Sequence, residues 1–482
     1  MFFNSIEFAI FLPLVFIFYW FVFKKNLKAQ NFFILVASYI FYGWWDWRFL
    51  SLIFFSSIVD YLVGLKLKST DKPGLRKIYL LTSISVNLGF LGFFKYYNFF
   101  AESFADAFTL FGTSIEPSRL NIILPVGISF YTFQTLSYSI DVYRRKLEPT
   151  KDIIAFFSFV SFFPQLVAGP IERATHLLPQ FYVKRKFKYE NAILGSRQIL
   201  WGLFKKIVIA DNCAKYANLI FNNSAEQTGS SLVLGAVFFA FQIYGDFSGY
   251  SDIAIGTSRL FGFDLMKNFS YPYFSRDIAE FWRRWHISLS TWFRDYLYIP
   301  LGGSKGSTAN KIRNTFIIFI VSGFWHGANW TFIAWGAINA IYFLPLLLLK
   351  RNRKNIGTVA ENSIFPSVRE VFSILSTFTL TTFAWIFFRA ESMKHAFDYI
   401  AGIFSKSLLA NPDLSAKGWI TLKLIVFFVI MEWIGRKEEF AIANLRIYNY
   451  KIPKWIFYYT IILMIYILGN YSETIEFIYF QF

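Results

Sequence analysis

A titratable side chain stands in the middle of an apolar, aromatic part of the chain. Residues 321–338 read VSGFWHGANWTFIAWGAI, and His326 lies there between Trp325 and Gly327. Imidazole is the side chain best suited to take a proton near neutral pH, so this position is typical of a general base. The alternative is a core histidine that hydrogen-bonds one carbonyl group and does nothing more. The glycines and Asn329, which loosen a helix at this point, favour the first interpretation.

A second histidine lies in residues 276–303, RDIAEFWRRWHISLSTWFRDYLYIPLGG. At helical spacing this segment has an apolar, aromatic face and a polar face. The apolar face comprises Trp282, His286, Leu289, Phe293 and Tyr296, and the polar face comprises Arg284, Ser288, Thr291 and Asp295. Such a helix lies in a membrane interface or lines a polar passage. An interfacial anchor accounts for the tryptophans and arginines, but accounts less well for His286.

Acidic and hydroxyl side chains interrupt the hydrophobic run at 244–256, which reads YGDFSGYSDIAIG. Asp246, Ser248 and Asp252 are candidates for lining a substrate path. A helix kink at the neighbouring glycines, or polar contacts between helices, explains the same residues equally well. Both interpretations stay open on the sequence.

The scaffold that positions these side chains is indicated by the composition. The chain has 482 residues, of which 55% are hydrophobic, 22% aromatic and 16% charged. Its mean hydropathy is +0.42, which is too apolar for a soluble protein with a wet surface. Several stretches approach the roughly twenty apolar residues that a helix needs to cross a membrane. We therefore predict an all-α polytopic membrane protein.

The charge distribution predicts how the chain is oriented. Lys and Arg number 48 against 30 Asp and Glu, a formal net charge of +18. In a membrane chain this excess indicates orientation and contact with anionic lipid, so no nucleic-acid partner is expected. The basic clusters, which are expected to be cytosolic, lie at 24–28, 66–77, 144–151, 173–188, 305–313, 350–354 and 436–454.

Alternation of these clusters with basic-poor segments requires about twelve crossings, or about 11–12 transmembrane helices with further re-entrant and interfacial ones. The runs counted as spans are 6–23, 31–43, 49–65, 78–100, 120–140, 194–221, 232–262, 315–327, 329–349, 371–389, 418–435 and 455–470. The first run lacks a small-residue cleavage site and is expected to be an anchor. The run at 153–170 lies between two basic loops and carries two prolines, so we expect it to enter the membrane and return.

Several classes of site are excluded by what the sequence lacks. No G-x-x-x-x-G-K-[ST] loop, H-E-x-x-H helix or H-x-x-x-x-D acyltransferase box occurs. The single Cys213 excludes a multi-cysteine metal site, and the four histidines are too dispersed to suggest any metal site. His176 and His395 lie near basic residues in expected loops and are assigned to the solvated surface. The residues alone indicate a membrane-embedded chamber; a polysaccharide or lipid transporter is the alternative, although no internal repeat supports it.

Several motifs in the chain resemble those of the membrane-bound O-acyltransferases. They are WHGANW around His326, FWRRWHISLSTWFRDYLYIPLGGS at 281–304, DFSGYSDIAIG at 246–256, FFPQLVAGPIER at 162–173, FAWIFFRA at 383–390 and FIYFQF at 477–482. The likeness is greatest to the bacterial branch that acetylates exported polysaccharide. It implies one integral-membrane domain over 1–482, with a funnel-like core at about 120–345 and peripheral helices at 1–119 and 346–482.

The resemblance also implies roles for individual residues. His326 would be the catalytic histidine and His286 the second histidine of the pattern. The implied reaction moves an acetyl group from a cytosolic donor, acetyl-CoA, to an exported, alginate-like polysaccharide, with no bound cofactor or metal. A periplasmic or extracellular protein would carry or transfer the acetyl group, and the enzyme would lie in the inner (cytoplasmic) membrane. A D-alanyl or peptidoglycan O-acyltransferase is the alternative.

Other side chains are candidates for supporting roles. Trp325 and Asn329 lie next to His326 in sequence and are candidate donors to an oxyanion. Arg283 and Arg284 are candidates for binding the phosphates of CoA, although the same arginines serve a lipid anchor equally well.

Overall fold

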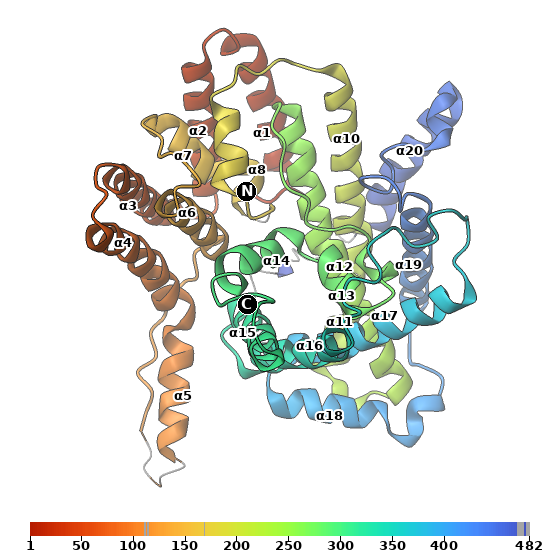
Figure 1. Cartoon of the computed structure of the whole chain (residues 1–482). Coiled ribbons are helices and arrows are strands. Elements are labelled where there is room, and N and C mark those ends of the chain that lie inside the picture. The colour runs from red at the N-terminus through yellow and green to blue at the C-terminus, as the bar shows by residue number, and fades with distance from the viewer. Residues whose placement is uncertain (110–111, 113–114, 168, 470–476, 479–482) are drawn as a thin grey trace. The chain divides into compact units, whose positions relative to one another are not determined.

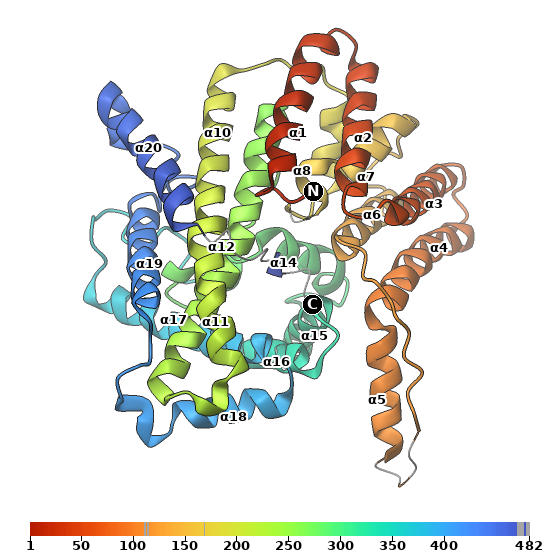
Figure 2. The same ribbon diagram turned by 180° about the vertical axis from the view of Figure 1, so that it is seen from behind.

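The computed structural model is helical (Figures 1 and 2). The residues that it describes are 1–109, 112, 115–167, 169–469 and 477–478. The chain forms two compact units, of which one comprises Met1–Gly195 with Ala254–Met266 and the other Ser196–Ile253 with Lys267–Phe482. The extent of the predicted single domain and of its core stays a prediction.

Six helices within the described residues are long and apolar enough to cross a membrane. They are Trp47–Lys68, Pro73–Thr109, Gly229–Leu260, Trp330–Leu348, Val368–Arg389 and Lys451–Leu468. The predicted class, an all-α polytopic membrane protein, is confirmed. The other predicted crossings fall on shorter or more charged helices and stay predictions.

The first unit begins with long helices and continues with short ones. Its elements are α1 (Ile6–Ile17), η1 (Phe18–Val22), α2 (Leu27–Gly43), η2 (Trp47–Phe49), α3 (Leu50–Lys68), α4 (Pro73–Leu91), η3 (Gly92–Tyr96), α5 (Tyr97–Thr109), α6 (Ile128–Tyr143), α7 (Ile153–Ser161), α8 (Phe163–Leu166), α9 (Ala174–Leu177) and η4 (Leu178–Phe181). The boundary between the units falls within α10 (Tyr189–Leu203) and within α12 (Gly229–Leu260).

Helices α3, α4 and α6 pack around a buried carboxylate, Asp60. Its oxygens accept hydrogen bonds from Ser83 Oγ at 2.5 Å, Asn87 Nδ2 at 2.8 Å and Ser139 Oγ at 3.0 Å. A buried polar group is tolerated when its hydrogen bonds are made, and here α4 and α6 supply the donors to Asp60 on α3. This network joins α3, α4 and α6 to one another.

The segment that was expected to enter the membrane and return forms two short helices. Helix α7 has 9 residues, which span only about 14 Å. The chain then turns at Phe162, whose ψ is 107°, and α8 begins with Pro164 in its first turn. A helix of this length does not cross a bilayer, which agrees with the prediction for 153–170.

The predicted span at 120–140 starts later than expected. Helix α6 begins only at Ile128, after Gly127 in a left-handed conformation with φ 75°. Pro125 removes a backbone donor and disfavours helical geometry at the residue before it. The apolar composition of residues 120–124 therefore does not continue the helix.

The second unit holds the remaining helices and both motif histidines. Its elements are η5 (Phe204–Ala210), α11 (Asp211–Asn222), η6 (Ser224–Glu226), most of α12, η7 (Pro272–Phe274), α13 (Ile278–Arg284), α14 (Ile287–Phe293), η8 (Arg294–Tyr298), α15 (Thr308–His326), α16 (Trp330–Leu348), α17 (Val368–Arg389), α18 (Met393–Ile403), η9 (Lys406–Leu409), α19 (Ala416–Ile434), η10 (Arg446–Asn449) and α20 (Lys451–Leu468).

Helices α15 and α16 form a tightly packed antiparallel pair. A Cβ atom at Gly323 would lie 2.2 Å from the carbonyl oxygen of Phe332, and one at Gly336 would lie 2.3 Å from that of Phe319. The two glycines therefore let the helix backbones approach closely.

Candidate active site

His326 is the last residue of α15. Gly327 follows in an extended conformation, and Asn329 caps the start of α16 by accepting a hydrogen bond from the Thr331 amide at 3.0 Å. The predicted helix break after His326 is confirmed, whereas the crossing of the membrane by α15 stays a prediction. Because the helix ends here, the buried imidazole is carried on a rigid element next to irregular backbone.

Aromatic rings surround the His326 imidazole on several sides. Ring centroids lie 5.0 Å away for Trp325 and 5.3 Å away for both Trp335 and Phe388. The planes of His326 and Trp335 are nearly perpendicular, at 89°. Edge-to-face packing of this kind is favourable and holds the imidazole in one orientation.

His286 occupies a break that the sequence did not predict. The expected helix over 276–303 is wrong in this respect, because α13 ends at Arg284 and α14 begins only at Ile287. His286 itself has a left-handed backbone, φ 43° and ψ 55°, which costs a non-glycine residue roughly 1–2 kcal/mol. Strained residues of this kind cluster at functional sites.

The break at His286 is held by a segment that precedes it in the chain. The Ile287 amide donates to the Asn268 carbonyl at 2.9 Å, and the Ser270 amide donates to the Arg284 carbonyl at 3.0 Å. The side chain of Asn268 accepts a further bond from Ser288 Oγ at 2.6 Å. Burial lowers the pKa of His286 to about 3, so its imidazole is neutral at physiological pH.

The two motif histidines meet at one cavity. Their ring centroids are 6.2 Å apart, and both line a cavity of about 250 Å³ in the second unit. Trp282, Leu289 and Phe293 line it as well. Four of the five residues that were predicted to share an apolar face therefore do so around this cavity, in spite of the break within the segment.

Polar and basic side chains line the rest of the cavity. Arg294 and Tyr298 come from η8, and Asn352 and Arg353 come from the loop after α16. Asn352 and Arg353 lie in a basic cluster, 350–354, that the charge alternation predicts to be cytosolic. The cavity thus connects the imidazoles of His286 and His326 with two guanidinium groups.

The model of the MBOAT, membrane-bound O-acyltransferase family matches residues 40–388 of the chain. The chain belongs to the membrane-bound O-acyltransferase family. The chain is therefore a multi-pass membrane acyltransferase, which confirms the resemblance seen in its motifs.

Curated relatives of this acyltransferase carry more specific names. The chain is 41% identical over 448 residues to a probable alginate O-acetylase of Pseudomonas putida, covering 92% of this chain and 88% of the relative. It is 35% identical over 421 residues to a peptidoglycan O-acetyltransferase of Helicobacter pylori, covering 82% and 77%. It is 30% identical over 278 residues to a teichoic acid D-alanyltransferase of Streptococcus thermophilus, covering 54% and 66%.

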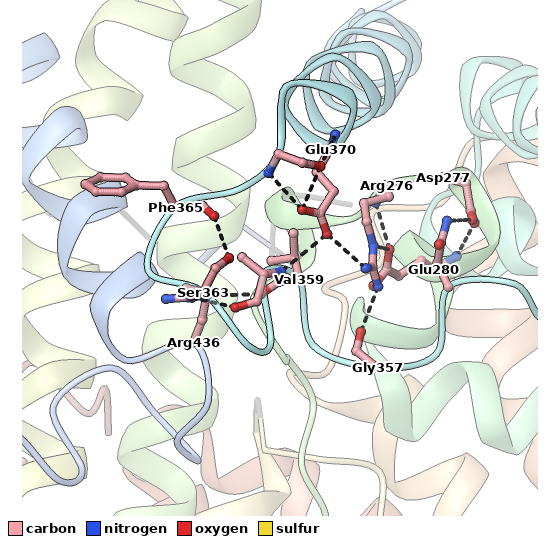
Figure 3. Close-up of polar contacts among 12 residues, drawn as sticks. Arg276, Asp277, Glu280, Gly357, Val359, Ser363, Phe365, Glu370 and Arg436 are labelled. Atoms are coloured by element: carbon pink, nitrogen blue, oxygen red, sulfur yellow. Dashed lines mark hydrogen bonds and ion pairs between the residues drawn. The ribbon is translucent and has the colours of Figure 1, made fainter.

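The loop of the acyltransferase that carries Asn352 and Arg353 is fastened by a polar network (Figure 3). Arg276 binds Glu280 at 3.0 Å and Glu370 at 3.3 Å, and it donates to the Gly357 carbonyl at 2.8 Å. Farther along the loop, the Arg436 guanidinium donates to three backbone carbonyls of the loop, those of Val359, Ala360 and Ser363. It also donates to the Trp433 carbonyl at 2.9 Å. These bonds position one side of the cavity.

Arg283 and Arg284 of the acyltransferase belong to the same polar network. Arg283 donates to the carbonyls of Asn352 at 2.7 Å and Asn355 at 2.6 Å, and Arg284 binds Glu280 at 2.9 Å. Neither residue lines the cavity. Their predicted contact with CoA phosphates stays a prediction, whereas Arg294 and Arg353, which the sequence reasoning missed, face the cavity itself.

The two candidate oxyanion donors lie in different surroundings. The Trp325 ring lies 5.9 Å from that of His286 and 5.0 Å from that of His326. The Asn329 side chain caps α16 and donates to the Glu391 carbonyl at 2.9 Å. Neither Trp325 nor Asn329 lines the cavity, but only the Trp325 ring lies next to both imidazoles. Trp325 is therefore the better placed of the two.

The acidic residues of α12 are held in ion pairs away from the cavity lining. Lys206 Nζ lies 2.9 Å from Asp246 and 2.8 Å from Asp211, and Lys205 Nζ lies 2.6 Å from Asp252. Ser248 is fully buried. Asp246, Ser248 and Asp252 do not line the cavity, so the geometry matches the interpretation as polar contacts between helices.

His176 is paired more strongly than a solvated histidine would be. Its Nδ1 lies 2.8 Å from the buried Glu172 carboxylate and its Nε2 lies 3.5 Å from Asp264, while 38% of the side chain is exposed. These carboxylates, Asp264 first, raise the pKa of His176 to about 10. The imidazole therefore carries a charge at neutral pH and joins two segments of the first unit. His395 lies on α18 and does not line the cavity. Its Nε2 is 3.3 Å from Ser224 Oγ.

Two further polar residues of the cavity were not singled out from the sequence. Ser322 and Ser290 both line the cavity. Each is four residues from a motif histidine, Ser322 before His326 and Ser290 after His286. Side chains four apart on a helix share a face, so helical spacing was the signal that could have found them.

Proposed function

We propose that this acyltransferase moves an acetyl group from acetyl-CoA to an exported, alginate-like polysaccharide at the inner membrane. The observation that carries the proposal is the single cavity lined by both His286 and His326 together with Arg294 and Arg353. The name of the relative in Pseudomonas putida, whose match covers most of both chains, supports acetate as the acyl group and alginate as the model acceptor.

Acetyl-CoA fits the chemistry of the cavity lining. Guanidinium groups bind phosphate through paired hydrogen bonds, so Arg294 and Arg353 suit the charged end of the donor. A cavity of about 250 Å³ is small for a whole nucleotide but suits an extended thioester arm. The donor would keep its phosphates at the arginines and place its carbonyl carbon near the histidines.

In the proposed reaction His326 is the general base. It takes the proton from an acceptor hydroxyl as the hydroxyl oxygen attacks the thioester carbonyl. A carbon–oxygen bond forms, the carbon–sulfur bond breaks, and the departing thiolate receives the proton from His326. His286, neutral because it is buried, orients or relays, and the Trp325 indole N–H is the candidate donor to the oxyanion.

The acceptor hydroxyl belongs either to the polymer itself or to a periplasmic or extracellular protein that passes the acetyl group on. Both routes use the same general-base step at His326. The relative in Helicobacter pylori favours a second candidate acceptor, peptidoglycan, because its name denotes peptidoglycan O-acetylation and the match covers 82% of this chain.

The proposed base is tested by His326→Ala in cells that lack their own copy of the enzyme. Acetyl transfer should fall by roughly 10²–10⁴-fold, the usual contribution of a general base, while the membrane abundance stays normal. The O-acetyl content of the exported polymer and the amount of folded protein are measured together. His395→Ala, a histidine outside the cavity lining, is the matched control and should keep its activity. Normal acetylation by His326→Ala would overturn the assignment.

Donor and acceptor are tested with purified protein. Thiol release from acetyl-CoA is followed in the presence of alginate oligosaccharides or of peptidoglycan fragments. Alginate oligosaccharides should accelerate release, and the acceleration should be absent in His326→Ala. Acceleration by peptidoglycan fragments alone would transfer the proposal to the second acceptor. No release with either acceptor would refute direct transfer from acetyl-CoA to the polymer.

The orientation of the membrane helices is tested with reporters. A reporter inserted in 305–312 should be cytosolic, because that loop is basic, and one at 225–229 should lie outside. The cavity lining at Arg353 would then lie on the side where acetyl-CoA is made. Both reporters on one face would contradict the proposed donor side.

A further inference from the structure

A second cavity, of about 420 Å³, lies in the first unit. It is formed by two segments that are far apart in sequence, the end of α1–η1 with the residues after it and the residues that precede α10. Lysines from both segments line it beside aromatic rings. Neither motif histidine belongs to this cavity, and the proposed acetyl transfer does not use it.

One wall of the cavity is aromatic and firmly placed. The Phe187 ring meets Trp20 nearly edge-on at 5.6 Å and 74°, and meets Phe16 at 6.0 Å and 75°. The Trp20 indole donates to the Leu260 carbonyl at 2.9 Å. Beside this wall the Phe21 side chain is 75% exposed and Phe187 is 49% exposed. An apolar surface is therefore presented at the end of an apolar helix.

The other lining residues are cationic. Lys24, Lys25, Lys184 and Lys186 are exposed, and none of them forms an ion pair within the part of the chain that the structure describes. Lysines that cluster without carboxylate partners repel one another and create a positive potential. No acidic residue lines the cavity to cancel it.

Arg185 adds a buried charge to the same cavity. Its Nη2 donates to the side-chain oxygens of Gln30 at 3.0 Å and Asn31 at 2.5 Å, which are neutral amides. The guanidinium also lies 4.6 Å from the centre of the Phe263 ring. These contacts hold the arginine in place and leave its charge uncompensated, so the floor of the cavity is positive as well.

We propose that this cavity binds an anionic phospholipid. Its phosphate would lie among Lys24, Lys184 and Lys186, and one acyl chain would lie against the aromatic wall. Both basic segments belong to clusters that the charge alternation predicts to be cytosolic, where the bilayer surface is rich in anionic lipid. An exposed apolar wall next to an anion site matches a lipid better than a soluble anion, which offers nothing to cover the wall.

Binding is tested with the full-length protein purified in detergent. Short-chain phosphatidylglycerol and phosphatidylcholine, each with two octanoyl chains, are added in separate titrations, and bound lipid is counted by native mass spectrometry. Phosphatidylglycerol should bind saturably and more tightly than phosphatidylcholine. The double variant Lys24→Gln with Lys186→Gln should bind it on the order of tenfold more weakly.

The matched control comes from the same two segments. Lys28→Gln with Lys188→Gln removes the same charge from exposed positions that do not line the cavity, and should bind like the unaltered protein. Equal weakening by both double variants would mean a diffuse charge effect and would overturn the site. All four lysines are exposed, and the melting temperature without added lipid verifies that each variant is folded.

Two further measurements, a competition experiment and a variant of the aromatic wall, identify the ligand. Inorganic phosphate and coenzyme A are offered as competitors for phosphatidylglycerol, and Phe187→Ala removes part of the aromatic wall. A lipid site should resist both competitors and lose affinity in Phe187→Ala. Displacement by either competitor at similar concentration, or equal binding of phosphatidylcholine and phosphatidylglycerol, would contradict the proposal.

Discussion

The second unit holds two sets of ionisable side chains in apolar surroundings. The two sets differ in whether an oppositely charged side chain or a cavity lies next to them. Lys206 is enclosed by Asp211 and Asp246 at 2.8 and 2.9 Å, so opposite charges compensate one another. His286 and His326 instead line a cavity that a substrate can fill. An ionisable residue in an apolar run therefore indicates packing where its partner is another side chain, and chemistry where it borders open space.

The largest effect that distinguishes the two sets is expected for Lys206→Met. The change leaves two buried carboxylates without their cation, which should lower the free energy of unfolding by about 3–5 kcal/mol. The yield of folded protein and its melting temperature in detergent measure this effect. Lys215→Met removes an exposed lysine from the neighbouring helix α11 and serves as the control. A stable Lys206→Met protein would show that the ion pairs are dispensable for packing.

A smaller effect is expected where the helices that carry His326 pack together. Gly323→Ala would place a Cβ atom 2.2 Å from the Phe332 carbonyl oxygen, so α15 and α16 must separate. Overpacking of this kind costs roughly 1–3 kcal/mol and should also lower acetyl transfer by moving His326. Melting temperature and polymer acetylation are measured together. Gly89→Ala, where nothing lies within 4 Å of the new Cβ, should change neither.

His286 should affect activity more than folding. Asn tolerates a left-handed backbone, so His286→Asn should fold while losing the imidazole. We expect acetyl transfer to fall about tenfold to a hundredfold, less than for His326→Ala, because in the proposed reaction His286 only orients or relays. A variant with normal kcat and a normal pH profile would limit His286 to a role in packing. Comparison with His286→Gly, which also suits the backbone, separates the side chain from the conformation.

The smallest effect is expected at His176, which belongs to neither set and is paired with the carboxylates of Glu172 and Asp264. Its pKa is about 10 in the folded protein against 6.5 for an unperturbed group, so protonation favours the folded state. The stabilisation is complete below about pH 6.5 and is lost as the pH rises towards 10. With a partly exposed side chain it amounts to about 1 kcal/mol. The melting temperature of His176→Gln should be lower than that of the parent protein at pH 6, and the two melting temperatures should be equal near pH 10. A difference that does not change with pH would refute the charge pairing.

Local sequence patterns predicted part of the site correctly, because helix ends and helical faces depend on residues that are close together in the chain. Glycines and a capping asparagine end one helix and begin the next, so the break after His326 was visible in the sequence. Helical spacing placed Trp282, His286 and Leu289 on one face, and they do share the cavity. Chain segments of a few residues carry this information themselves.

Contacts between distant segments were beyond such reasoning. The left-handed turn at His286 exists because residues 268–270 pair with the backbone on either side of it. The pairing of His176 with Asp264 joins positions 88 residues apart, which no local periodicity encodes. Arg353 lines the cavity because a loop is fastened by residues from α13, α17 and the segment after α19.

The sequence by itself determined the membrane class, the helix break at His326 and the family. The length of hydrophobic runs, the capping residues and the motifs are all properties of short, continuous stretches of the chain. Only the tertiary structure decided which ionisable groups are paired and which border a cavity. Pairing depends on side chains brought together from separate helices, and its free energy depends on the burial that the packed helices create. For this reason Asp246 and His326, alike in their apolar surroundings along the chain, have different parts in the folded protein.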